Sequence, residues 1–378
     1  MLVCVDISEL YKVDFVSGIQ RVVIEVTTKW IKDKKEVRLL VYDNKKGKYA
    51  IVDNQRYLEY NLGRSDKKNY LTKKYMNIQD FNKECIFFDM DSAWMNPMKR
   101  SYLLPLIKKN GCKVVAHFYD IIPITEPEYC HEHTIAMFME YVAAHLDNDD
   151  FFITNAQATV DAIRKVTDGL SQENLPYSVV KLGSDIKVAE NTAVNRKHIL
   201  NLINGAPYVL MVDTMEPRKN HKYVLDAFDS GLFDEGMNLV IVGRKGWNID
   251  DLITRIENHS QYNKQLFWIN DASDVEVQAF YKNAFCVAFA SHNEGFGLPI
   301  IESIKMGTPV FAADKAVLRE VGGEYCEYFD TIKPEALVSL VKEYNNDDAK
   351  YKKLKSKLKG YKETTWASCA EEMYMRLV

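Results

Sequence analysis

The chain has little of several features that mark specialised classes of protein. No apolar run approaches the roughly 20 residues that span a bilayer, and no signal-peptide pattern opens the sequence. The seven cysteines are odd in number and scattered, and they form no Cys-x-x-Cys pair of the kind that binds zinc or cycles disulfides. A basic excess is also missing, because the net charge is −4, which argues against nucleic-acid binding. We therefore expect a cytoplasmic protein with buried thiols and no bound metal.

What is present suits two globular domains. A chain of 378 residues exceeds one ordinary core, and 47% hydrophobic with 27% charged residues is the balance of a compact protein. The Lys-rich stretch Lys350–Lys362 either follows a solvated helix face or contacts an anionic membrane surface. The expected location is thus cytoplasmic, with peripheral contact at the inner face of the membrane as the alternative.

Apolar runs alternate with stretches of helical spacing along nearly the whole chain. Strands are expected at Met1–Ile7, Val37–Tyr42, Cys85–Phe88, Lys113–Phe118 and Phe151–Thr154, and then at Tyr208–Val212, Asn238–Val242, Leu266–Ile269, Phe285–Phe289 and Pro309–Ala312. This alternation predicts an α/β protein of two Rossmann-like domains with parallel sheets. We place the first domain at residues 1–190, the second at 200–360, and a final helix at 361–378 that packs back on the first.

The strongest chemical signal is the stretch Asn293–Glu302, where a strand ends, a glycine turn follows and a helix begins near Leu298. Glycines let the backbone approach an anion, and the helix start offers free N–H groups and the positive end of a dipole. The turn therefore predicts a diphosphate site. Its members are Gly295, Phe296, Gly297 and Leu298, with Glu302 one turn into the helix for a ribose and Glu294 before the turn for a sugar. A common turn with an early-helix acid is the alternative.

Basic residues follow two strands of the same half. Arg218 and Lys219 come after Tyr208–Val212, and Arg244 comes after Asn238–Val242. Cations beyond the carboxyl ends of strands could neutralise a diphosphate leaving group, whereas taken alone they would be surface charges.

These motifs together resemble a known family, the retaining GT-B glycosyltransferases with a Glu-x7-Glu motif, and within it the bacterial mannosyltransferase-like enzymes of polysaccharide and O-antigen assembly. The residues that carry the resemblance are Ser17–Val22, Tyr119–Pro123, Glu216–Asn220, Gly243–Trp247 and Glu294–Glu302. The resemblance implies two domains facing across a cleft and retaining hexosyl transfer from a nucleoside diphosphate sugar to a glycan or lipid-linked glycan. It favours a GDP-linked donor over a UDP-linked one, and it implies no cofactor.

The same resemblance implies roles for single residues. Arg218 and Lys219 would hold the diphosphate, Glu302 the ribose and Glu294 the transferred sugar, with Gly18 near the phosphates and Asp120 in the catalytic set. This sequence departs from the family pattern at two positions that bear on which group lies beside the donor sugar. Many relatives have an Arg where this chain has Asp213, and a His-Asp pair where it has Tyr119-Asp120. If the strand alternates, His117 points the same way as Tyr119 and either could replace the family histidine.

Other interpretations remain open. Asp89-Met90-Asp91 has the spelling of a metal-binding Asp-x-Asp, although an acceptor-side or structural role is favoured. Trp94 either stacks on an acceptor sugar or belongs to a core edge. The whole chain could instead be a sugar-nucleotide epimerase on the same fold, or a catalytically silent GT-B subunit that binds a partner.

Overall fold

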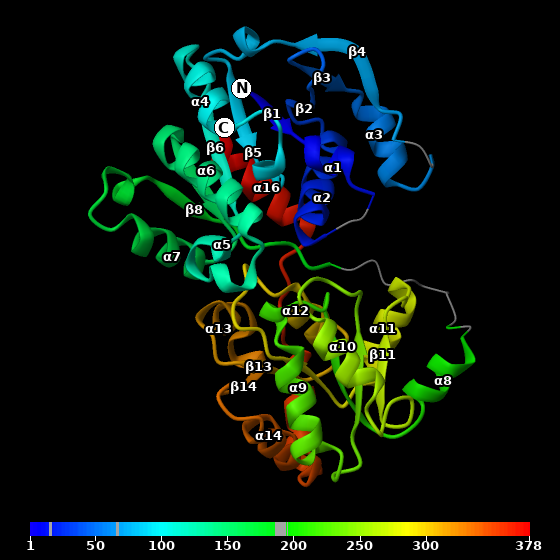
Figure 1. Cartoon of the computed structure of the whole chain (residues 1–378). Coiled ribbons are helices and arrows are strands. Elements are labelled where there is room, and N and C mark those ends of the chain that lie inside the picture. Colours follow the sequence, from blue (N-terminus) through cyan, green and yellow to red (C-terminus); the bar gives the residue numbers. More distant parts are fainter. Residues whose placement is uncertain (15–16, 66–67, 186–193, 195) are drawn as a thin grey trace. The chain divides into compact units, whose positions relative to one another are not determined.

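The computed structural model describes residues 1–14, 17–65, 68–185, 194 and 196–378 (Figure 1). The chain divides into two compact units: unit 1 comprises Met1–Asp185 and Thr364–Val378, and unit 2 comprises Ile186–Glu363. The expected boundary at residues 190–200 falls partly in 186–193, which lie outside the described residues.

The described part of unit 1 is built on an eight-stranded sheet in the order β4-β3-β2-β1-β5-β6-β7-β8. The strands β2, β1, β5, β6, β7 and β8, in this spatial order, are parallel to their neighbours. At the edge of the sheet, β3 is antiparallel to β2, and β4 is antiparallel to β3. The strands are β1 (Leu2–Asp6), β2 (Val37–Asp43), β3 (Lys48–Val52), β4 (Leu71–Met76), β5 (Cys85–Asp89), β6 (Lys113–Phe118), β7 (Phe151–Thr154) and β8 (Tyr177–Val179). The helices are α1 (Ser8–Lys12), α2 (Gly18–Lys32), α3 (Asn54–Asn61), α4 (Arg100–Lys109), α5 (Ile122–Thr125), α6 (Glu132–Asn148), α7 (Gln157–Thr167) and α16 (Trp366–Leu377).

The described part of unit 2 has a six-stranded, all-parallel sheet in the order β11-β10-β9-β12-β13-β14. The strands are β9 (Tyr208–Val212), β10 (Asn238–Val242), β11 (Leu266–Ile269), β12 (Cys286–Phe289), β13 (Val310–Ala313) and β14 (Cys326–Phe329). The helices are α8 (Lys197–Ile203), α9 (His221–Ala227), α10 (Asp250–Glu257), α11 (Asp274–Asn283), α12 (Leu298–Lys305), α13 (Ala316–Gly322), α14 (Glu335–Asn345) and α15 (Asp348–Leu358). The expected α/β class with two Rossmann-like sheets is confirmed.

The central strands are mostly apolar because helices cover both faces of a parallel sheet. Every residue of β10 and β12 is buried, and β9 is buried up to its last residue. Since all strands of unit 2 run the same way, their carboxyl ends meet at one edge of the sheet, where ligands of such folds bind.

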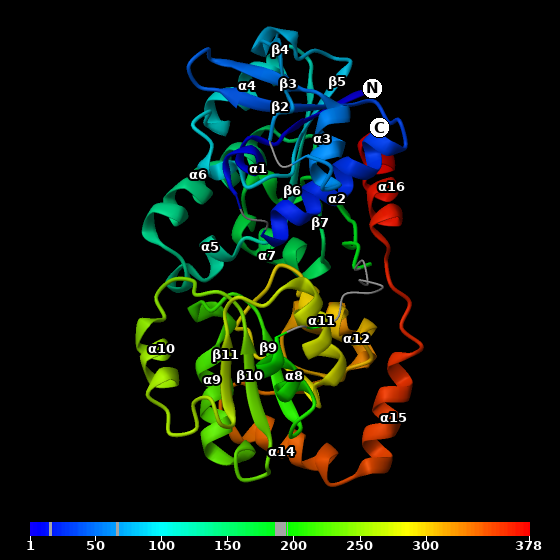
Figure 2. The ribbon, with the colours of Figure 1, turned by 90° about the vertical axis from the view of Figure 1, so that its right-hand side faces the viewer.

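The C-terminal helix α16 packs on α2, as the sequence predicted, and Figure 2 shows the two helices side by side. The Trp30 Nε1–H group donates a hydrogen bond of 2.7 Å to the carbonyl of Ala370. The first residue of α16, Trp366, packs closely against the backbone of unit 1, because a Cβ added at Gly183 would lie 2.5 Å from it. The last helix thus completes the core of unit 1.

Candidate active site

The glycine turn between β12 and α12 forms the helix start that the sequence predicted. Gly297 precedes the first helical residue and has φ of 96°, a left-handed conformation that favours glycine. Pro299 follows in the first turn, where its missing N–H costs no helical hydrogen bond. An added Cβ at Gly297 would lie 3.3 Å from Leu318 and 3.4 Å from Ile300. The turn therefore holds the α12 amino end in a fixed position.

A second turn, after β9, lies directly beside the first. Pro217–Lys219 form a short 3-10 helix, and Asn220 takes a left-handed conformation with φ of 58°. The Asn220 side chain donates a hydrogen bond of 3.2 Å to the carbonyl of Ala290. The N–H of His292 donates one of 2.9 Å to the carbonyl of Arg218. These two contacts bring the basic residues after β9 to the residues after β12.

Five charged side chains meet at this junction, and we call them the ion-pair cluster: Asp213, Glu216, Arg218, Lys219 and Glu294. Lys219 Nζ lies 2.6 Å from Asp213 Oδ2 and 2.8 Å from Glu294 Oε1. Arg218 lies 2.6 Å from Glu216 through Nη2 and 2.9 Å from the second oxygen of Glu294 through Nη1. Glu294 therefore bridges the two cations.

Burial makes these charges interact strongly. Burial alone would raise the pKa of Glu294, but Arg218 and Lys219 outweigh it and hold that pKa below its ordinary value. Burial raises the pKa of Asp213 and of Glu216 despite the neighbouring cations. Burial would lower the pKa of Lys219, yet Asp213 and Glu294 raise it, so this lysine is a cation at neutral pH.

The other predicted residues of unit 2 lie around the same sheet edge. Glu302 is half-buried on α12, and the Tyr281 hydroxyl donates a 3.3 Å hydrogen bond to it. Arg244 is exposed, and its carbonyl accepts a 2.9 Å hydrogen bond from the N–H of Met215. The loop after β10 runs so close to the loop after β9 that a Cβ on Gly243 would lie 1.7 Å from the Asp213 carbonyl oxygen. Arg244 is thus tied to the cluster through the backbone.

Two of the predicted site residues belong to unit 1. Gly18 begins α2 with open space around its Cα, because an added Cβ would have no atom within 4 Å. Asp120 follows β6, and its Oδ1 accepts a 2.9 Å hydrogen bond from the N–H of Ile122. Asp120 also lines a pocket of this unit.

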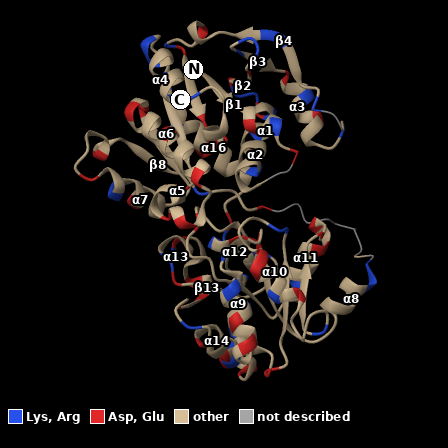
Figure 3. Ribbon diagram, in the orientation of Figure 1, with Lys and Arg blue, Asp and Glu red and all other residues tan. Residues whose placement is uncertain are grey.

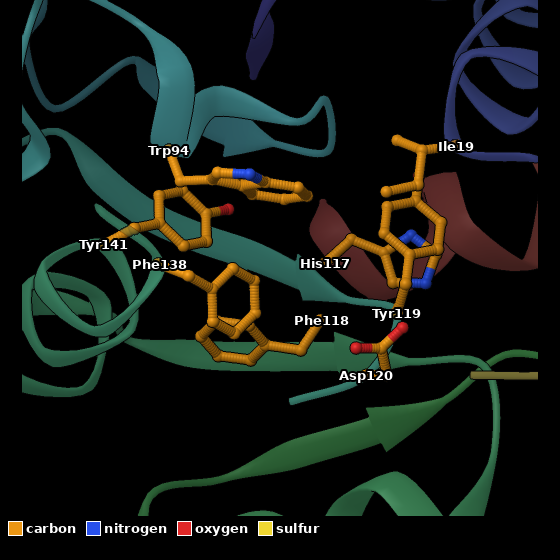
Figure 4. Close-up of a pocket in the computed structure, with 8 residues that line it drawn as sticks. All are labelled: Ile19, Trp94, His117, Phe118, Tyr119, Asp120, Phe138 and Tyr141. Carbon is orange, nitrogen blue, oxygen red and sulfur yellow. The ribbon is translucent and has the colours of Figure 1, made fainter. Parts of the chain in front are cut away.

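A pocket in unit 1 is lined mostly by aromatic side chains (Figure 4). Its lining residues are Ile19, Trp94, His117, Phe118, Tyr119, Asp120, Phe138 and Tyr141. Trp94 makes edge contacts with Phe138 and Tyr141 at centroid distances of 5.0 and 5.8 Å. The indole is therefore both half-buried in an aromatic cluster and part of the pocket wall, so the two interpretations of Trp94 are compatible.

His117 and Tyr119 lie on the same side of β6, as strand alternation predicts, with ring centroids 4.2 Å apart. The Tyr119 hydroxyl donates a 2.7 Å hydrogen bond to the Met90 carbonyl, so it is engaged inside the unit. Neither ring nitrogen of His117 has a hydrogen-bond partner among the described residues. Burial lowers the pKa of His117 to about 3, which keeps the imidazole neutral. His117 is thus the member of the pair with unused polar groups.

The Asp-x-Asp sequence has internal partners. Asp89 pairs with Arg100 and, at 3.0 Å, with His145 Nε2, and all three side chains are buried. Asp91 Oδ2 accepts a 2.8 Å hydrogen bond from the N–H of Leu10. No group of three or more potential metal-ligating side chains gathers anywhere in the ranges that the structure describes. These contacts agree with a structural role, one of the two roles favoured for Asp89-Met90-Asp91.

Much of the charge of the Lys-rich helix α15 is balanced locally. Lys350 pairs with Glu343, Lys352 with Asp348 at 2.5 Å and Lys357 with Glu324 at 3.5 Å. Figure 3 shows basic and acidic residues interspersed on the helices of unit 2. Within the described residues, no helix combines the length and the apolar character needed to cross a bilayer.

Comparison with known proteins adds a family match. Residues 195–360 match the family model described as "Glycosyl transferases group 1". The chain is 33% identical over 246 residues, 62% of its length, to the serotype-specific mannosyltransferase WbdA of Escherichia coli, and 28% identical over 357 residues in a second alignment with a WbdA protein of that organism. These alignments cover 29% and 42% of those relatives, so the chain spans less than half of their length. The O-antigen chain mannosyltransferase B of Escherichia coli is 25% identical over 63% of the chain and 62% of the relative.

Solved structures show the same fold. Anabaena Alr3699/HepE in complex with UDP and glucose aligns over 100% of this chain and 99% of its own, with a TM-score of 0.68 and 14% identity. WaaG, a glycosyltransferase involved in lipopolysaccharide biosynthesis, aligns over 100% of both chains with a TM-score of 0.62 and 13% identity. The expected GT-B fold is thereby confirmed.

Proposed function

Because the chain belongs, through residues 195–360, to the group 1 glycosyltransferase family, we propose that it transfers a hexosyl group with retention from a nucleoside diphosphate sugar to a glycan or lipid-linked glycan acceptor. The observation that carries this proposal is the ion-pair cluster beside the α12 amino end. There Arg218 and Lys219 each lie within 3 Å of a carboxylate oxygen of Glu294, at the carboxyl edge of the unit 2 sheet.

The proposed roles follow from charge. As the bond to the sugar breaks, negative charge develops on the leaving diphosphate, and preorganised cations and helix N–H groups stabilise it. Arg218 and Lys219 supply the cations, and Gly295, Phe296, Gly297 and Leu298 present the backbone. Because these groups already supply positive charge, a divalent metal is not needed.

The two glutamates take different ends of the donor. Glu302, on α12 beside Tyr281, accepts hydrogen bonds from the ribose, and Glu294, before the glycine turn, lies beside the transferred sugar. Arg244 adds positive charge on the neighbouring loop. From unit 1 we assign Gly18 to donor binding and Asp120 to catalysis, with His117 in place of the family histidine.

The donor is proposed to be GDP-mannose. Relatives named as mannosyltransferases align over most of the chain, which supports mannose. UDP occurs in the solved complex of a protein with the same fold, so UDP-linked sugars are the competing donors. The glycan acceptor would be met in the cytoplasm, and any contact of α15 with the inner face of the membrane would rest on those lysines that lack an acidic neighbour.

Calorimetry with GDP and UDP tests the donor site. We expect GDP to bind more tightly than UDP, and Lys219→Ala to weaken GDP binding at least about tenfold, because a charge-assisted contact to phosphate is lost. Lys222→Ala is the matched control, since Lys222 is 72% exposed and pairs with Asp226 on the same helix. Equal GDP affinity of folded Lys219→Ala and wild type would contradict the site, whereas tighter UDP binding would contradict only the choice of donor.

A further inference from the structure

The ion-pair cluster carries more acid than base. It contains three carboxylates and two cations, so its formal charge is −1 before any ligand binds. A nucleoside diphosphate sugar adds two more negative charges from its diphosphate. Like charges in a buried site repel one another strongly. A carboxylate in such a site can relieve the repulsion by taking up a proton.

The three carboxylates are not equally placed. Glu294 contacts both cations, and Glu216 contacts Arg218 at 2.6 Å. Asp213 contacts Lys219, and this is its single cationic partner within 4 Å in the part of the chain that the structure describes. When Lys219 turns its ammonium group toward a diphosphate, Asp213 loses its cationic partner, whereas Glu294 and Glu216 keep their contacts with Arg218.

The surroundings of Asp213 offer little replacement. Its side chain is 15% exposed, and its Oδ1 accepts a 2.9 Å hydrogen bond from the N–H of Thr214. The charged groups that act on it are Lys219 and Arg218 from the turn after β9, Glu216 from the same turn, and Glu294 from the turn after β12. Arg244 and Lys245 lie on the neighbouring loop after β10 and are exposed. His221 is buried nearby and is neutral, because burial lowers its pKa to about 3.

We propose that Asp213 is a positioning residue that holds Lys219 in the empty site and takes up one proton from solvent when the diphosphate of the donor binds. This inference rests on the proposed function. The protonated carboxyl keeps its place beside Lys219 as a neutral group, so the ammonium is shared between Glu294 and the diphosphate. Donor affinity is then coupled to pH through one side chain. Binding takes up a proton, so it weakens as the pH rises and the proton concentration falls.

The test is calorimetry with GDP-mannose and UDP-glucose in buffers of different ionisation enthalpy, between pH 6 and 8.5. Nucleotide sugars are suitable probes because their diphosphate is a diester and does not titrate in this range, unlike free GDP. For the wild type we expect proton uptake approaching one per donor bound, and a Kd that rises toward tenfold per pH unit above the pKa of Asp213. In Asp213→Asn the uptake should vanish and the Kd should become independent of pH.

Asp314→Asn is the matched control. Asp314 is the first residue after β13, as Asp213 is the first after β9, and it pairs with an arginine, Arg319, in an exposed setting. This variant should keep the proton uptake of the wild type. Thermal unfolding of each variant checks that it folds. If Asp213→Asn does not fold, the pH dependence of donor binding by the wild type still tests the proposal.

The outcomes separate this inference from the proposed function. Donor binding without proton uptake in the wild type would overturn the role of Asp213 and leave the glycosyltransferase proposal intact. Uptake that persists in folded Asp213→Asn would assign the proton to another carboxylate and would also overturn it. Failure of both nucleotide sugars to bind would overturn the proposed function, and this inference with it.

Discussion

At the scale of single residues, Glu294 and Glu302 have different partners although both belong to one motif. Glu294 is buried between Arg218 and Lys219, whereas Glu302 is half-buried on α12 beside Tyr281. A change at Glu294 alters the charge next to the proposed sugar and diphosphate. A change at Glu302 alters a contact proposed for the ribose. The two substitutions should therefore separate binding from turnover.

We predict that Glu294→Gln keeps its affinity for the free nucleoside diphosphate or gains some, because Arg218 and Lys219 lose a competing carboxylate. Its transfer rate should fall at least about tenfold, a rise of about 1.4 kcal/mol in the activation barrier. Glu302→Ala should instead weaken nucleotide binding by about 1–3 kcal/mol. Calorimetry with nucleotide and turnover with donor measure both. Equal loss of affinity and turnover in Glu294→Gln would make Glu294 a nucleotide ligand or a structural support.

The sequence identified the residues of the cluster better than their contacts. Arg218, Lys219 and Glu294 could be selected because strand ends and a glycine turn mark a ligand edge in parallel sheets. The pairing of Asp213 with Lys219 could not be predicted from the sequence, because it depends on how the turn after β9 closes around Asn220. The missing hydrogen bonds of His117 were equally hidden, since they depend on side chains from other elements.

At the scale of elements, the start of α12 depends on a left-handed glycine. Gly297 has φ of 96° and tight neighbours, while Gly307, at the other end of the same helix, has φ of 76° and no atom within 4 Å of an added Cβ. Alanine is strained at both positions by about 1–2 kcal/mol. Only the first turn presents backbone N–H groups to the proposed diphosphate.

We predict that Gly297→Ala weakens nucleotide binding several-fold beyond its effect on stability, because the added Cβ shifts the turn that holds these N–H groups. Gly307→Ala should lose a similar amount of stability with unchanged nucleotide affinity. Calorimetry and thermal unfolding of the two variants provide the comparison. Nucleotide affinity that is lost equally in both, or in neither, would argue against a backbone phosphate site at this turn.

The helix α16 offers a matched pair for its own role. Met373 is fully buried and Met375 is 63% exposed, two residues apart on one helix. We predict that Met373→Ala destabilises unit 1 by about 2–5 kcal/mol, the usual cost of removing a buried large side chain. Met375→Ala should stay within about 0.5 kcal/mol of wild type. Hydrogen exchange resolves the effect by unit: amides of α2 should lose protection in Met373→Ala, and amides of β9 and β10 should not. Unchanged protection of α2 would contradict the assignment of α16 to this core.

Strands were predicted best where they are central and apolar. The bounds of β6, β7, β9 and β10, all interior strands of their sheets, agree with the expected ones because each consists mostly of apolar residues. The strands β3 and β4, which form the antiparallel edge of the unit 1 sheet, were missed, and in β4 two exposed lysines interrupt the apolar run. The three-residue strand β8 and the half-buried β14 gave too short a signal.

At the scale of the whole molecule, the proposed reaction uses positive charge supplied by the protein rather than by a metal. The Asp-x-Asp carboxylates have partners inside unit 1, and the ion-pair cluster of unit 2 provides the cations. The rival interpretations differ in product. An epimerase would convert the nucleotide sugar without releasing a diphosphate, and a silent subunit would leave it unchanged.

The most direct test is therefore an NMR time course of the wild-type protein with an α-linked nucleotide sugar, GDP-mannose first, and a panel of mannose-bearing glycans in excess EDTA. We predict that the donor's anomeric signal is replaced by a new glycosidic signal of the same configuration, with one nucleoside diphosphate released for each bond formed. Inversion of the configuration, epimerisation without release of diphosphate, or turnover only after magnesium is restored would contradict the account.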